Sequence, residues 1–292
     1  MSVLGQRIIA FLDILGFSDR LTEGHLEELA GAYGDLIDDA KSRVFGQSDA
    51  GVSVRNFEIG QFLFDSVVLI SKPLGHDAPA SVFHFFSALN ILFEESFRRK
   101  LPLRGAVGIG NVVEDPSRGL LLSDIFPALV RAEKSMEWSG VILLPESADE
   151  ILLALYGTVE SELPRSREGH VVEYDVPLKG ESSARRWCLN WVSAAEPPTI
   201  AAGLAFLKEP KKTNTKGFIS YVESLPTGSV LAPPSLDPIH RVIVQATRAG
   251  FNIKFLDKNG LGVDPRPGTR FTIQIVDPAT GKRRDTEVGG PV

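Results

Sequence analysis

Near the start of the chain, residues Ile8 to Phe17 carry a single charge in an otherwise apolar run. They read IIAFLDILGF, and the charge is Asp13. A continuous apolar run of this kind predicts a strand that is buried in a sheet. An ionised carboxylate taken out of water without a partner costs several kcal/mol or more. The fold must therefore supply Asp13 with something positive or hydrogen-bonding.

The order of apolar patterns between residues 6 and 145 predicts an α+β fold with helices over one sheet. It contains the split βαβ pattern of ferredoxin-like folds. The predicted strands are 6–13, 54–59, 66–71, 103–113 and 141–145, and the predicted helices are 19–45, with Ser18 as N-cap, 79–99 and 123–138. The two short strands around residue 60 read as a hairpin.

The later part of the chain divides into two regions that differ in composition. Up to residue 225 we predict helices at 146–157, 197–208 and 214–225 and strands at 170–176 and 186–193. After Pro226 the chain becomes rich in Gly and Pro, with short β-like pieces. We therefore predict a larger domain, 1–228, and a linker with a small β-rich extension, 229–292.

Composition excludes some functional classes. The net charge is −6 and the sequence pI is about 5.5, which argues against nucleic acid or an anionic membrane as the main partner. Cys188 is the only cysteine, so no internal disulfide can form. The N-terminal segment lacks the pattern of a signal peptide, and no apolar run reaches the length of a membrane span. We expect a cytoplasmic protein.

A second acidic residue in apolar surroundings, Asp65, follows Asp13 after 52 residues, in FLFDSVVLIS. If the two strands lie side by side, the carboxylates face each other at one end of the sheet. Two such carboxylates repel unless a cation lies between them, and Mg²⁺ is held by one or two carboxylates together with substrate phosphates. Backbone N–H groups after Asp13 offer an anion site at a helix N-terminus. This pattern indicates a nucleoside triphosphate bound with metal ions.

Four motifs resemble those of the class III nucleotide cyclases, and most of all the pyrimidine cyclases of bacterial Pycsar anti-phage systems. They are FLDILGFS, FDSVVLIS, LPLRGAVGIGNVV and PALVRAE, and the match covers roughly residues 6–145. The resemblance implies a cyclase core with an antiparallel-rich sheet covered by helices and a C-terminal helical and β extension. It implies a lyase that makes a 3′,5′-cyclic nucleotide, which a separate effector protein reads as a defence signal.

The resemblance also assigns roles to individual residues. Two Mg²⁺ or Mn²⁺ ions are expected on Asp13, Asp65 and the carbonyl of Ile14. Backbone N–H groups of Leu15, Gly16 and Phe17 are expected to hold the phosphates. Arg131 is expected to meet the charge that develops on the α-phosphate. In this family two chains pair head to tail, so Arg131 would act across a homodimer interface and a monomer would be inactive.

The base cannot be assigned from these motifs alone, because the chain departs from the family pattern. Purine cyclases usually place Asn four residues before the arginine, where this chain has Pro127. Gln61 occupies the place of a base-reading Lys or Glu and can both donate to and accept from a uracil or cytosine edge. Phe62 is a candidate to stack on the base. We favour UTP as the substrate and cyclic UMP as the product.

Plainer interpretations stay open for each residue. Asp13 on its own can be a structural cap, Arg131 can be a solvent-facing helix residue, and Arg104 is expected to be a structural ion-pair partner rather than a phosphate contact. Two alternative functions also remain. One is the same chemistry on ATP or GTP, and the other is a non-catalytic nucleotide-binding or interaction module that uses residues 230–292 as its docking surface.

Overall fold

The computed structural model describes residues 2–40, 59–74, 78–156, 169–180, 182–227, 252–256, 271–276 and 283–288. The chain divides into two compact units, of which the first is Met1–Val44 with Asn56–Pro234 and the second is Phe45–Arg55 with Ser235–Val292. The predicted boundary between residues 228 and 229, like part of the predicted strand 54–59, lies outside the described residues.

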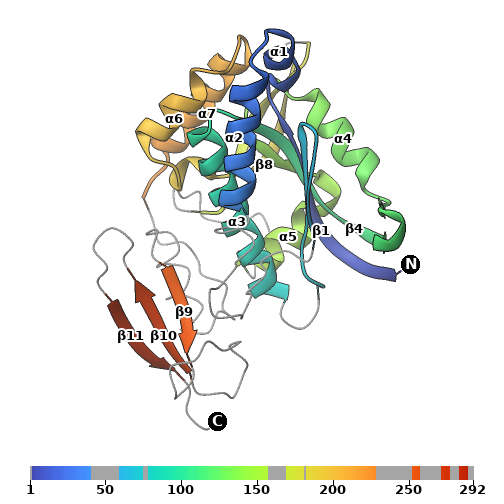
Figure 1. The fold of residues 1–292 in the computed structure, drawn as a ribbon, viewed down its shortest axis with the longest axis vertical. Helices are drawn as coiled ribbons and strands as arrows, with labels where there is room; N and C mark the ends of the chain where they lie inside the picture. The colour runs from blue at the N-terminus through green and yellow to red at the C-terminus, as the bar shows by residue number, and fades with distance from the viewer. Residues whose placement is uncertain are drawn as a thin grey trace. The chain divides into compact units, whose positions relative to one another are not determined.

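The first unit is built on one mixed, eight-stranded sheet (Figure 1). Its strand order is β2-β3-β1-β4-β6-β8-β7, with β5 paired to β4. All neighbours are antiparallel except β4 and β6, which run parallel. The strands are β1 Ser2–Ile14, β2 Ile59–Leu63, β3 Ser66–Ile70, β4 Leu103–Asp115, β5 Leu120–Ser123, β6 Val141–Leu143, β7 Val171–Leu178 and β8 Ser182–Leu189.

Seven α-helices of the described residues surround this sheet. They are α1 Phe17–Thr22, α2 Leu26–Asp39, α3 Ala78–Arg98, α4 Phe126–Ser135, α5 Pro145–Tyr156, α6 Pro197–Leu204 and α7 Lys211–Ser224, with short 3₁₀ turns at Pro116–Arg118 and Trp191–Ser193. The longest helix, α3, contacts α2, α5 and α6, whereas α4 packs over β1 and β4. The predicted α+β class with helices on a sheet is therefore confirmed.

Local differences from the predicted elements have clear causes. The predicted helix 19–45 is two helices, because Gly24 adopts φ +86° between α1 and α2. Ser18 lies inside α1, and Gly16, at φ +76°, is the N-cap instead. Strand β5 was not predicted; it pairs with the end of β4 and closes a hairpin.

The alternation of side chains along the strands decides which residues face which helix. Asp13 pairs with Ser66 of β3 and with Arg104 of β4, and Arg104 contacts Glu133 of α4. One residue earlier in β1, Leu12 pairs with Val67, and Val67 pairs with Phe62. These side chains lie on the other face of the sheet. The ring of Phe62 contacts Tyr33 of α2, at 6.0 Å between centroids. Helices α2 and α4 therefore cover opposite faces of the sheet (Figure 1).

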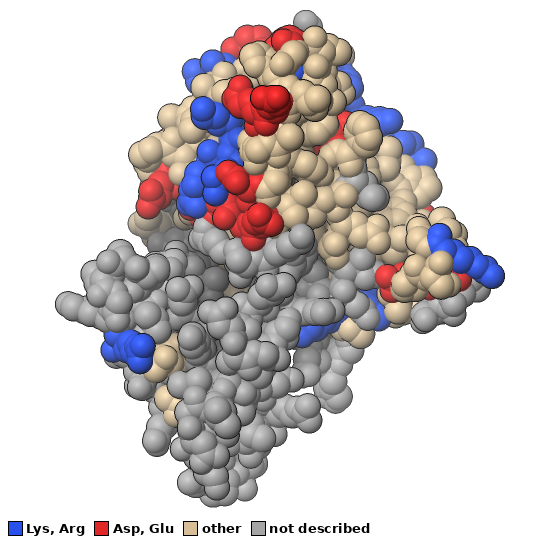
Figure 2. Space-filling model, viewed as in Figure 1, with Lys and Arg blue, Asp and Glu red and all other residues tan. Residues whose placement is uncertain are grey.

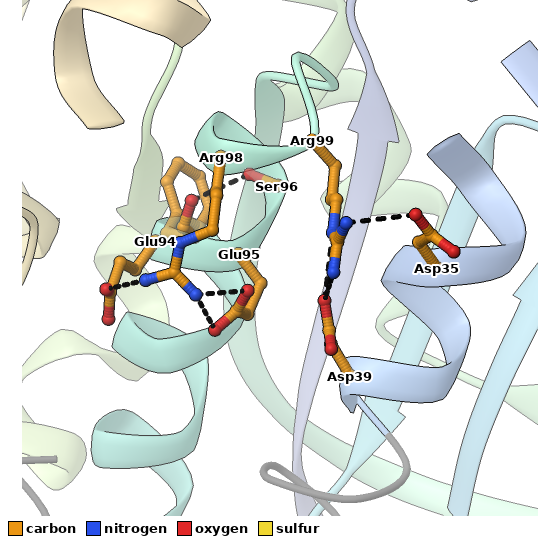
Figure 3. Close-up of polar contacts among 8 residues, drawn as sticks. Asp35, Asp39, Glu94, Glu95, Ser96, Arg98 and Arg99 are labelled. Carbon is orange, nitrogen blue, oxygen red and sulfur yellow. Dashed lines mark hydrogen bonds and ion pairs between the residues drawn. The ribbon is translucent and has the colours of Figure 1, made fainter. Parts of the chain in front are cut away.

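Two arginines at the C-terminal end of α3, Arg98 and Arg99, form ion pairs (Figure 3). Arg99 donates to Asp35 at 2.9 Å and to Asp39 at 2.7 and 3.0 Å, so it joins the end of α3 to α2. Arg98 pairs within its own helix with Glu94 and Glu95. Among the described residues, Arg99 is the one of these two arginines whose ion pairs reach a second helix.

Replacing Arg99 with glutamine is expected to lower the free energy of unfolding by about 1 kcal/mol, because its ion pairs are partly exposed but join it to two carboxylates of α2. Urea unfolding at low salt measures this loss, which should shrink as salt is added. Arg131→Gln is the matched control, since Arg131 is exposed and the described residues offer it no ion pair. Equal losses from the two variants would contradict this role.

The second unit contains a three-stranded antiparallel sheet in the order β11-β10-β9. Its strands are β9 Asn252–Leu256, β10 Phe271–Val276 and β11 Arg283–Val288. Two of them, β9 and β10, fall on the β-like pieces that the sequence predicts, and β11 was not predicted.

On the face of the first unit seen in Figure 2, basic side chains lie beside acidic ones, and the described residues form no continuous basic patch there. Lys208, for example, pairs with Asp19 at 3.0 Å and with Glu23 at 3.2 Å. No helix among the described residues is long and apolar enough to cross a membrane.

Candidate active site

Strand pairing brings the two aspartates of the sequence motifs together. Asp65 lies in the tight turn between β2 and β3, directly before Ser66, and Ser66 pairs with Asp13. The N–H of Ile14 donates to the carbonyl oxygen of Asp65 at 2.7 Å, which ties this turn to the end of β1. The expected hairpin is therefore present, and it sets the two acidic side chains at one end of neighbouring strands. Its first strand, β2, extends to Leu63 and so includes residues 60–63, which were predicted to lie in the turn.

The turn that carries Asp65 has an unusual backbone. Phe64 adopts φ +61°, a conformation that bulky residues rarely take, and its side chain is 80% exposed. Such a conformation costs on the order of 1–3 kcal/mol and persists only where the surrounding structure enforces it. Here the Ile14 hydrogen bond and the pairing of β2 with β3 enforce it.

A third carboxylate and an arginine lie next to Asp13. Nη2 of Arg104 is 3.6 Å from Oδ2 of Asp13 and also forms a short ion pair with Glu133 on α4. Nη1 of Arg104 donates to the carbonyl oxygen of Met136 at 2.8 Å. Both Arg104 and Glu133 are buried. The expectation that Arg104 is an ion-pair partner is confirmed.

Arg104 gives Asp13 a protein cation as a neighbour, in addition to the metal ions expected from the sequence motifs. The compensation is nevertheless incomplete, because Arg104 is shared with Glu133. Burial raises the pKa of Asp13 from 3.8 to about 7, with further contributions from the negative charges of Glu133 and Asp65 that outweigh the opposing Arg104. Asp13 is thus poorly satisfied as an anion in the protein alone.

The charge of this cluster favours a divalent cation. With Asp13 ionised, Asp13, Asp65 and Glu133 carry three negative charges against the positive charges of Arg104 and of Lys134, which acts on Asp13 more weakly. The net charge is −1. Carboxylate oxygens are the ligands that Mg²⁺ and Mn²⁺ prefer. Among the described residues no group of three or more His, Cys, Asp or Glu side chains is arranged as a complete metal site. Asp13 and Asp65 therefore fit a metal ion whose remaining ligands come from substrate, backbone or water.

The loop after β1 differs in part from its expected role. The N–H of Leu15 donates to the carbonyl oxygen of Pro102 at 2.9 Å, so it is not available to a phosphate. The first intrahelical bond of α1 runs from Arg20 N–H to the Gly16 carbonyl. The N–H groups of Gly16 and Phe17 precede it and have no intrahelical acceptor.

The two residues expected at the base do not lie on the same face. Gln61 of β2 pairs with Val68 of β3, and Val68 pairs with Phe11 of β1. Phe11 is two residues before Asp13, so these side chains lie on the same face of the sheet as Asp13, the face that α4 covers. Phe62 belongs to the alternate row and packs towards Tyr33 of α2. Gln61 can therefore share a surface with Asp13, whereas the predicted stacking of Phe62 on the same base does not fit this geometry.

Arg131 faces away from the two aspartates within one chain. Glu133 and Leu129, one turn apart on α4, are buried against the sheet. Arg131 is two residues from each, or about 200° around a helix, and it is exposed. The fold of one chain therefore does not turn Arg131 towards the cluster around Asp13.

Glu133 is the residue of this cluster that sequence reasoning did not single out. Its signal was present, since an acidic residue four positions after Leu129 falls on the apolar face of α4. A buried acid on such a face requires a cation, and Arg104 was the candidate on the neighbouring strand.

The raised pKa of Asp13 predicts a pH-dependent stability. Between about pH 4 and 7 the folded protein keeps a proton on Asp13 that the unfolded chain releases, so this group's contribution to stability falls as the pH rises through that window. The Asp13→Asn variant lacks this titration. Relative to that variant, the wild type should lose free energy of unfolding between pH 5 and pH 8 in metal-free buffer, measured by urea unfolding. A constant difference across this range would contradict the assignment.

A cavity of about 300 Å³ lies beside the loop that follows β1, between α1 and residues 205–211. Its charged lining residues neutralise one another, since Lys208 pairs with Asp19 and Glu23 and Arg20 pairs with Glu28. The uncompensated negative charge lies at Asp13 and Asp65, so we place the candidate active site there.

Comparisons of the chain with models of protein families and with curated proteins give no match.

Proposed function

We propose that this protein is a nucleotide cyclase that converts a pyrimidine nucleoside triphosphate, with UTP favoured, into the 3′,5′-cyclic monophosphate and pyrophosphate. The observation that carries the proposal is the pairing of Asp13 with the Asp65 turn at one end of β1 and β3, in a cluster with net negative charge. The order β2-β3-β1-β4, in which β3 separates β1 from β2, supports the ferredoxin-like core expected for such an enzyme.

In this proposal Asp13 and Asp65, with the carbonyl of Ile14, hold two Mg²⁺ or Mn²⁺ ions. When bound, the ions lower the pKa of the ribose 3′-hydroxyl and neutralise charge on the triphosphate. The 3′-oxygen loses its proton to solvent and attacks the α-phosphorus in line, the bond from phosphorus to the bridging oxygen breaks, and pyrophosphate leaves. Gly16 and Phe17 donate backbone N–H groups to the phosphates.

A second copy of the chain completes the proposed site. Because Arg131 faces away from Asp13 of its own chain, it serves the site of the other copy in a head-to-tail homodimer. There it stabilises the negative charge that develops on the α-phosphate, an interaction worth several kcal/mol in comparable sites. Gln61, on the same face as Asp13, reads the edge of a uracil through its amide.

The proposed biological setting follows from the resemblance of the motifs to Pycsar cyclases. The protein acts in the bacterial cytoplasm, and its cyclic nucleotide is a signal in anti-phage defence that a separate effector protein binds. Neither nucleic acid nor membrane takes part, consistent with the mixed charges of the surface in Figure 2.

The test is incubation of the purified protein with each of the four ribonucleoside triphosphates and Mn²⁺, followed by separation of cyclic products. UTP is expected to give cyclic UMP and pyrophosphate in equal amounts. A product from ATP or GTP alone would assign a purine cyclase instead. No cyclic product from any of the four, in a folded dimer, would exclude cyclase activity and favour a non-catalytic module.

A further inference from the structure

Tyr33 is a half-buried aromatic residue of α2 whose ring lies beside the segments that carry Asp13 and Asp65. Its ring contacts Phe17, the first residue of α1, at 5.7 Å between centroids, and Phe62 of β2 at 6.0 Å. Both contacts are edge-to-face, with interplanar angles of 68° and 75°. Such pairs contribute about 0.5–1.5 kcal/mol each and fix the direction in which the hydroxyl points.

The hydroxyl of Tyr33 is buried and finds no hydrogen-bond partner among the described residues. An unsatisfied buried hydroxyl costs about 1–3 kcal/mol. Phenylalanine would keep both ring contacts without this cost, so packing alone does not account for a tyrosine. The hydroxyl needs a partner that the described part of the chain does not provide.

Asp65 lies in the turn that follows β2, three residues after Phe62, whose ring contacts that of Tyr33. Burial raises the pKa of Tyr33, and the negative charge of Asp65 raises that pKa further, as expected for two groups that lie close together. Within the described residues the Asp65 carboxylate accepts a single hydrogen bond, from the Ser66 hydroxyl at 3.3 Å. A carboxylate accepts up to about four, so Asp65 has acceptor capacity left for Tyr33.

We propose that Tyr33 is a positioning residue, whose hydroxyl donates a hydrogen bond to the Asp65 carboxylate when that carboxylate binds a divalent cation. A protein donor on the far side of a ligating carboxylate fixes its orientation, and loss of such a donor typically lowers metal affinity or activity about 10- to 100-fold. The proposal rests on the part of the proposed function that places a metal ion on Asp65. It adds α2, through Tyr33, to the elements that build the site.

The test compares Tyr33→Phe with the matched control Tyr221→Phe in the full chain. The Tyr221 hydroxyl donates to the Glu173 carbonyl at 2.8 Å, so its loss removes a structural hydrogen bond away from the site. Mn²⁺ binding is measured by titration calorimetry without nucleotide, and stability by urea unfolding without metal. Tyr33→Phe is expected to bind Mn²⁺ about 10- to 100-fold more weakly and to be at least as stable as wild type. Tyr221→Phe should keep its Mn²⁺ affinity and lose stability.

The outcomes separate this inference from the proposed function. If Tyr33→Phe binds Mn²⁺ as tightly as wild type while wild type forms cyclic UMP, the role of Tyr33 is refuted and the cyclase proposal stands. If wild type forms no cyclic nucleotide but its Mn²⁺ affinity depends on Tyr33, the positioning role stands and the cyclase proposal fails. An equal loss of Mn²⁺ affinity in both variants would indicate a general structural effect and would refute the role. A wild type that binds no Mn²⁺ would refute it as well.

Discussion

Replacing Asp65 with asparagine is expected to lower cyclic-nucleotide formation by on the order of 10³-fold or more, because an amide cannot supply the anionic ligand that a divalent cation requires. The fold should survive, because Ile14 is held by the backbone carbonyl of Asp65 and not by its carboxylate. The measurement is the initial rate of cyclic product and pyrophosphate release, with unfolding in urea as the check on structure. A variant that keeps more than about a tenth of the wild-type rate would contradict the metal role of Asp65.

Mixing two inactive variants tests whether one site uses two chains. Neither Asp65→Asn nor Arg131→Ala alone should form product. In a mixed dimer of the two, one site combines an intact Asp65 with an intact Arg131 from the other copy. Random pairing of equal amounts makes half of the dimers mixed, so about a quarter of the sites should be active. No recovery of activity in dimers shown to exchange chains would refute action of Arg131 across the interface.

Replacing Arg104 with methionine is expected to have the largest effect on stability, a loss of about 3–5 kcal/mol in the free energy of unfolding. Arg104 is the buried cation shared by Asp13 and Glu133, and its removal leaves Glu133 charged and buried against the sheet. Urea unfolding at pH 7 measures the loss. The exposed Arg185, which pairs with Glu173 and Asp175, is the matched control, and Arg185→Met should cost about 1 kcal/mol or less.

The double variant Arg104→Met with Glu133→Leu separates the cost of the uncompensated carboxylate from that of lost packing. It should recover much of the stability that Arg104→Met loses, because the stranded charge is removed together with its partner. No recovery in the double variant would mean that the ion pair does not account for the effect. In Arg104→Met alone the Asp13 carboxylate loses its neighbouring cation while Glu133 keeps its charge, so the pKa of Asp13 should rise further and Mn²⁺ binding at neutral pH should weaken.

Much of the fold was predictable because the spacing of apolar residues along the chain indicates helices and strands. The helix predicted at 79–99 is α3, Ala78–Arg98, since apolar residues recur along it at helical spacing. The hairpin that carries Asp65 was predicted from two short strands around a turn, and it is formed by β2 and β3. The break between α1 and α2 was missed, because one glycine at positive φ interrupts a pattern that otherwise continues.

The candidate active site was likewise predictable only in part. That Asp13 lies in a buried strand and that Asp65 follows a second strand could be concluded from the residues alone, because burial and strand period are properties of neighbours in the chain. Which groups meet them depends on register and on how α4 docks. Only the folded chain shows that Arg104 serves Glu133 as well as Asp13, that the Leu15 N–H is already bonded to Pro102, and that Gln61 and Phe62 face opposite sides. Each of these is a contact between segments distant in sequence, about which local patterns carry no information.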